Sequence, residues 1–164
     1  MQILLALAAL AARAEPVWAP PPLVTFERYP LLYGDRVKVD VELLPPPKAG
    51  PRQYAFKRVF VGPNGEDEGQ PYYTDTIYCP QALRSLQQLT NLPGPQPGME
   101  GLEKGPAEGS LRDGVVYRLS VATTPPYSFG DMTLRSNTGT PLARWVNETL
   151  KTLKPCWRPT QLKL

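Results

Sequence analysis

The sequence predicts a single α+β domain, in which an antiparallel sheet of about five or six strands carries two helices on one face and one disulfide joins the elements. Several short segments alternate apolar and polar residues or are rich in aromatic and β-branched side chains, as strands are. Two other segments repeat their apolar residues at helical spacing, and the chain's two cysteines border them. The same segments leave open a β-sandwich with peripheral helices.

The first fourteen residues predict an export signal. Residues 3–12 form an unbroken apolar run, and residues 12–14 (Ala-Arg-Ala) match the small-x-small pattern of a signal-peptidase site. The run is shorter than the roughly 20 residues that a membrane-spanning helix needs. We therefore expect cleavage after residue 14, a periplasmic or secreted location and no membrane anchor in the mature chain. Residues 15–22 are a proline-rich arm, and residues 23–164 are the single domain.

The first strands are predicted from alternation. In Arg36–Leu43, the odd-numbered positions are apolar and the even-numbered ones are charged, the period-2 pattern of a strand with one buried and one wet face. Residues 26–32 form a plausible weaker strand before it, separated by a turn. The three prolines at 45–47 end the strand, since proline cannot donate to a sheet ladder.

A hairpin follows. Residues 54–61 and 72–79 are rich in aromatic and β-branched residues, and they flank the polar segment 62–69. That segment contains Asn64-Gly65, a dipeptide typical of hairpin turns. We expect an antiparallel hairpin with a long acidic tip.

Two helices are predicted from spacing and from proline. The first begins at Pro80, which suits the first helical position, and it ends near Asn91. Its narrow apolar stripe comprises Ala82, Leu83, Leu86 and Leu89. The second begins with Thr140 as N-cap and Pro141 as first residue, and Pro155 ends it. Its apolar stripe comprises Leu142, Trp145, Val146, Thr149, Leu150 and Leu153.

A glycine- and proline-rich segment separates the two halves of the domain. Residues 92–114 lack an apolar period, and we expect a flexible loop there. The segments 115–122 and 127–135 predict two further strands.

Cys79 and Cys156 are the only cysteines, and in an exported protein such a pair is expected to form a disulfide. A catalytic cysteine would need a histidine partner, and the chain contains no histidine. The bridge would close a long loop, which the chain-entropy model values at about 4 kcal/mol of stability. We therefore expect the pair to be structural.

The lack of histidine excludes much enzyme chemistry. It removes Ser-His-Asp and Cys-His triads and the usual zinc and copper ligand sets, so we expect no metal site. Neither a phosphate-binding loop nor a Gly-x-Gly-x-x-Gly sequence is present, and we expect no cofactor. The 18 basic and 15 acidic residues are interspersed, and this pattern does not favour nucleic-acid binding.

Carboxylates are the main remaining catalytic candidates. Asp40, Glu42, Asp75 and Asp131 lie on or near predicted strands, and a pair of such acids could hydrolyse a polysaccharide of the cell wall or another glycan. The acidic segment 66–68 invites a calcium hypothesis, but it lacks the alternating register that points ligands inward. Charges on the polar faces of strands are common and explain the four acids without a site, and a solvated hairpin tip explains segment 66–68.

Tyrosines give a softer indication of binding. Tyr72, Tyr73, Tyr78, Tyr117 and Tyr127 fall on neighbouring strands, where an exposed row of rings could stack on a sugar or anchor a partner protein. Core packing is the alternative explanation. Our hypothesis is an exported binding, inhibitor or assembly protein, rather than an enzyme, whose partner is a protein or glycan of the cell envelope. A carboxylate-dependent hydrolase is the alternative.

Overall fold

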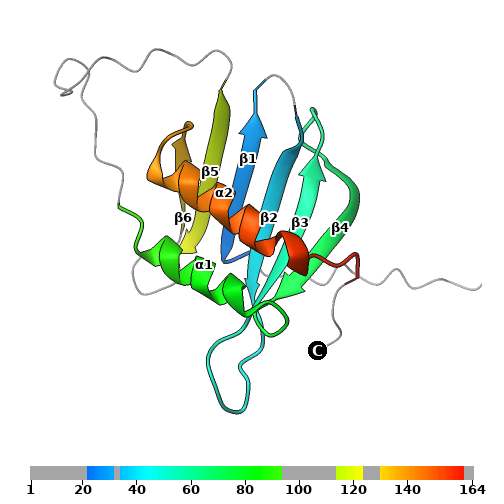
Figure 1. Cartoon of the computed structure of the whole chain (residues 1–164), viewed down its shortest axis with the longest axis vertical. Helices are drawn as coiled ribbons and strands as arrows, with labels where there is room; N and C mark the ends of the chain where they lie inside the picture. The colour runs from blue at the N-terminus through cyan, green and yellow to red at the C-terminus, as the bar shows by residue number, and fades with distance from the viewer. Residues whose placement is uncertain (1–21, 32–33, 94–113, 124–129, 161–164) are drawn as a thin grey trace, which may run out of the picture.

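The computed structural model describes residues 22–31, 34–93, 114–123 and 130–160. Within them, six antiparallel strands form one open sheet, and both helices lie on the same face of it (Figure 1). The predicted α+β class is confirmed. The β-sandwich alternative is wrong for the described residues, because all six strands belong to a single sheet.

The elements follow the chain in an order that builds the sheet outward from β1. They are β1 (Val24–Pro30), β2 (Arg36–Leu43), β3 (Tyr54–Val61), β4 (Asp67–Asp75), α1 (Pro80–Thr90), β5 (Val115–Thr123), β6 (Gly130–Ser136) and α2 (Pro141–Leu153). The strand order is β4-β3-β2-β1-β5-β6. Strands β1 to β4 form a meander, and β5 and β6 extend the sheet from the other side of β1.

The alternation in the sequence divides the sheet into an apolar face and a polar face. Phe26 on β1 pairs with Val39 on β2 and with Leu119 on β5, and these side chains point toward the helices. One residue further along, Glu27 pairs with Lys38 and Arg118, which point to the other side. The core therefore lies between the sheet and the helices.

Helix α2 crosses the apolar face diagonally and packs on β1 and β5 (Figure 1). It begins as the sequence predicts, because Thr140 Oγ1 accepts a hydrogen bond from the backbone nitrogen of Ala143 at 3.1 Å. The indole ring of Trp145 meets the ring of Phe26 edge-on, with centroids 5.0 Å apart. A short 3₁₀ turn, Lys154–Cys156, follows α2 directly.

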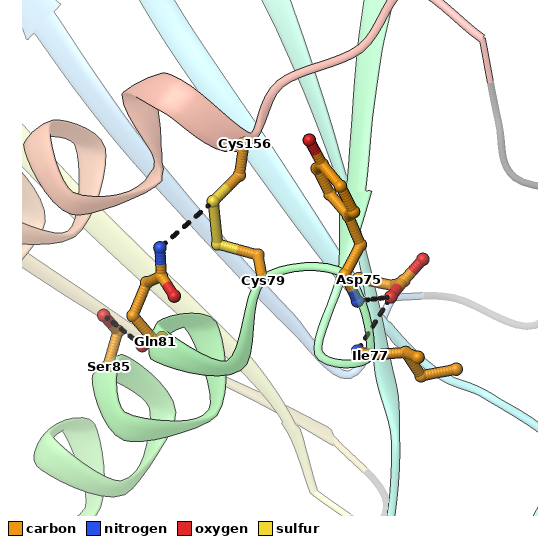
Figure 2. The surroundings of a disulfide bond; sticks show 7 residues. Asp75, Ile77, Cys79, Gln81, Ser85 and Cys156 are labelled. Carbon is orange, nitrogen blue, oxygen red and sulfur yellow. Dashed lines mark hydrogen bonds between the residues drawn. A yellow bond between two sulfur atoms is a disulfide. The ribbon is translucent and has the colours of Figure 1, made fainter.

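The disulfide predicted between Cys79 and Cys156 is present, and it joins the start of α1 to the end of α2 (Figure 2). Both cysteines are buried, and Gln81 Nε2 lies 3.4 Å from Cys156 Sγ. Further along both helices, Trp145 Nε1 of α2 donates a 2.8 Å hydrogen bond to the backbone oxygen of Ser85 on α1. Helix α1 is therefore held by α2 at two points.

Some boundaries differ from those predicted. Strand β1 begins and ends two residues earlier than the predicted strand 26–32. Strand β4 begins at Asp67, within the segment predicted as the hairpin tip, and ends at Asp75 rather than at Cys79. It ends there because the Asp75 carboxylate accepts hydrogen bonds from the backbone nitrogens of Ile77 and Tyr78, which turns the chain toward α1.

Several predictions fall partly or wholly outside the described residues. The signal peptide at 1–14 and nearly all of the arm at 15–22 lie there. So do residues 94–113 of the predicted loop, and residues 127–129 of the last predicted strand, whose described part is β6.

Candidate functional site

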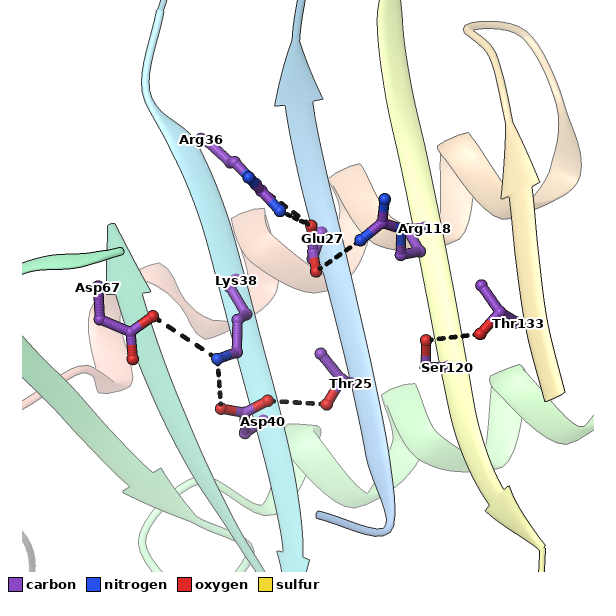
Figure 3. A network of polar contacts seen from close by, with 9 residues as sticks. All are labelled: Thr25, Glu27, Arg36, Lys38, Asp40, Asp67, Arg118, Ser120 and Thr133. Carbon is purple, nitrogen blue, oxygen red and sulfur yellow. Dashed lines mark hydrogen bonds and ion pairs between the residues drawn. The ribbon is translucent and has the colours of Figure 1, made fainter. Parts of the chain in front are cut away.

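The polar face of the sheet carries a network of ion pairs, and this network accounts for two of the acids (Figure 3). Glu27 is nearly buried, and its carboxylate lies 2.8 Å from Arg36 Nη2 and 3.6 Å from Arg118 Nη1. Asp40 accepts a 2.7 Å hydrogen bond from Thr25 and lies 3.4 Å from Lys38 Nζ. Lys38 also approaches Asp67, at 3.6 Å. The network of cations and carboxylates therefore spans four strands, β4, β2, β1 and β5.

The four acids proposed as hydrolytic candidates lie in different settings. Asp40 is engaged in the network, Glu42 is exposed two residues further along β2, and Asp75 caps the turn before α1. The side chain of Asp131 is outside the described part of the chain. Among the described residues, no group of three or more acids and cysteines could hold a metal ion.

The structure distributes the tyrosines rather than gathering them on one surface. Tyr72 and Tyr73 are neighbours on β4, so their rings point to opposite faces. Tyr117 is buried in the core, where its hydroxyl accepts a hydrogen bond from Asn147, and Tyr78 lies beneath the guanidinium of Arg158. Tyr127 lies outside the described residues.

Tyr72 belongs to a cation–π cluster that joins the C-terminal segment to the sheet. The guanidinium carbon of Arg58 lies 4.6 Å from the ring centroid of Tyr72 and 5.0 Å from that of Trp157. Burial lowers the pKa of Arg58 from its ordinary value, and the interaction with Tyr72 opposes this shift. The contacts give this cluster a structural role.

An apolar cavity of about 1100 Å³ lies between α1 and the sheet. Its volume is slightly above the roughly 300–1,000 Å³ typical of ligand pockets. Three leucines of α1 form one wall, and the apolar face of the sheet, from β2 to β6, forms the other. The main apolar residues that line it are Leu83, Leu86, Leu89, Val24, Val41, Leu119, Val121, Met132 and Leu134.

The position of α1 explains why this space is not filled. The residues that α1 buries most completely are small, Ala82 and Ser85, and the helix packs against α2. Its leucines stay only partly buried: Leu86 and Leu89 pack against the core, and all three line the cavity. On the opposite wall, Met132 of the edge strand β6 is half exposed.

Polar groups line one part of the cavity. Ser136, Asn137 and Thr140 come from the turn between β6 and α2, and Gln87 and Thr90 come from the second half of α1. The end of α1 and the start of α2 both lie on the β6 side of the sheet (Figure 1). An apolar chamber with a few neutral polar groups on one side is the usual form of a small-molecule binding site.

The sequence pointed only indirectly to this site. The stripe of Leu83, Leu86 and Leu89 indicates an apolar helix face, but the pattern does not tell whether a neighbouring element fills the space beside it.

No protein-family model, curated protein or solved structure matches the chain. Within the described residues, no helix is long and apolar enough to cross a membrane. The cavity is therefore the candidate site on geometry alone.

The polar face generates a prediction about stability. Replacing Glu27 by glutamine (Glu27→Gln) removes the charge that separates Arg36 from Arg118, and we expect it to lower the free energy of unfolding by about 1–3 kcal/mol. Glu42→Gln is the matched control: Glu42 lies on the same face of the sheet, on β2, but it is exposed. Its replacement should cause no measurable change in the free energy of unfolding. Urea unfolding followed by circular dichroism measures both. Equal stability of the two variants would contradict a structural role for the network.

Proposed function

We propose that this chain is an exported, non-catalytic binding protein, and that its ligand is an apolar molecule held between α1 and the sheet. The observation that carries the proposal is the apolar cavity of about 1100 Å³ beside α1. Burial of an apolar ligand there would be favourable by about 25 cal/mol for each Å² removed from water.

The proposed ligand differs from the protein or glycan partner that the sequence predicts. A sugar site would use exposed aromatic rings as stacking platforms, and the described tyrosines are dispersed over both faces of the sheet and the core. The cavity instead offers aliphatic side chains, which suit an aliphatic or lipid-like molecule of the cell envelope. The hydrolase alternative gains no support, since Asp40 and Asp75 are committed to ion pairing and turn formation.

Export is part of the proposal. The apolar segment 3–12 supplies the features of a signal, and the Cys79–Cys156 disulfide fits an oxidising compartment such as the periplasm or the extracellular space. Mass spectrometry of the protein from the envelope fraction of its native host should give a chain that begins at Glu15 and lacks the two thiol hydrogens. An intact N-terminus with two free thiols would contradict export.

Ligand binding can be tested by filling the cavity. The neutral fluorescent probe N-phenylnaphthylamine should bind the wild-type protein, with a rise in emission as the probe leaves water. Leu86→Trp places a larger side chain in the cavity wall and should weaken binding by about tenfold or more. Met132→Trp should act in the same direction from the opposite wall, at a half-exposed position that tolerates substitution.

The control is Leu31→Trp, which adds an equally large side chain at an exposed position outside the cavity. It should leave the affinity unchanged, and circular dichroism should show that all three variants are folded. Unchanged binding in both folded cavity variants would refute the proposed site, and so would absence of binding to the wild-type protein.

A further inference from the structure

The charge of the cavity wall restricts the kind of ligand more than the volume of the cavity does. Apart from Arg135, its polar residues are uncharged: Tyr54, Gln87, Thr90, Ser136, Asn137 and Thr140. Arg135 is the one charged residue among the described residues that line the cavity. The direction of its side chain therefore decides whether the site can neutralise an anion.

The register of β6 directs Arg135 away from the cavity. Strands β5 and β6 pair without interruption, with Leu134 opposite Leu119 and Arg135 opposite Arg118. Leu134 and Leu119 line the cavity. Since neighbouring residues of a strand point to opposite faces, Arg135 extends from the polar face and contributes only its backbone to the cavity wall.

Two contacts mark that polar face independently (Figure 3). Thr133 and Ser120 form a hydrogen bond of 3.1 Å there, and Arg118 pairs with Glu27. Arg135 lies two residues beyond Thr133 on the same strand, and it therefore lies on the same face. The described cavity wall thus offers hydroxyl, amide and backbone groups but no cationic side chain.

We infer that the ligand is a neutral amphiphile, with a long apolar chain and an uncharged hydroxyl, amide or ester head, rather than a fatty acid or another anionic lipid. This inference rests on the proposed function. The apolar chain would lie between the leucines of α1 and the apolar face of the sheet, and the head would meet Ser136, Asn137 and Thr140. A carboxylate there would lose its hydration without gaining a counter-ion, which is costly.

A pair of probes of equal chain length tests the inference. Decanol and decanoate differ in the charge of the head. Isothermal titration calorimetry near neutral pH gives both affinities, below the solubility limit of decanol and the micellar concentration of decanoate. We expect decanol to bind at least about tenfold more tightly than decanoate, because only the carboxylate must be desolvated as an ion. Decanamide, a second neutral probe, should follow decanol.

Arg135→Ala is the control variant for the direction of the arginine. It should leave the affinities for all three probes unchanged, since its guanidinium lies on the other face of the sheet. Decanoate binding as tightly as decanol, or decanoate binding that Arg135→Ala abolishes, would overturn the inference and leave the proposed function intact. Absence of binding by every probe would overturn both the inference and the proposed function.

Discussion

The hydrogen bond from Trp145 to the backbone of Ser85 holds α1 against α2, and the cavity depends on the position of α1. Trp145 is itself fixed by its edge-on contact with Phe26 in the middle of the sheet. The disulfide ties the start of α1 to the turn after α2, so the two constraints act at separate points along the helix. Because α1 is held by α2, its three leucines stay only partly buried and form one wall of the cavity.

The two faces of the sheet have different roles in this account. The polar face is occupied by its own ion pairs, in which each cation already has a carboxylate partner, as Arg36 and Arg118 have Glu27. Within this network the cations and carboxylates already neutralise one another, so the network has little to gain from a further polar partner. The face of the sheet that carries the helices contains apolar surface that the fold leaves incompletely buried. A ligand that covers this surface gains free energy by removing it from water.

The strong periodicities made much of the fold predictable. Alternation along Arg36–Leu43 assigned the two faces of β2, and the Thr140 cap and apolar spacing defined α2. The start of β4 was not predictable, because its exposed residues Asp67–Gln70 lack the alternation of a strand. The dispersal of Tyr72 and Tyr73 follows from their adjacency once the strand is known. The cavity could not be predicted, since residue spacing gives the polarity of a surface but not its distance from the next element.

The central claim is that the space between α1 and the sheet holds an apolar ligand, and methyl NMR tests it most directly. In protein labelled at leucine and valine methyl groups, titration with decanol should shift the signals of Leu86, Val121 and Leu134. Val59 and Val61 are buried on the polar face, and their signals should stay in place. Shifts spread equally over both faces, or no shift at saturating decanol, would contradict the account.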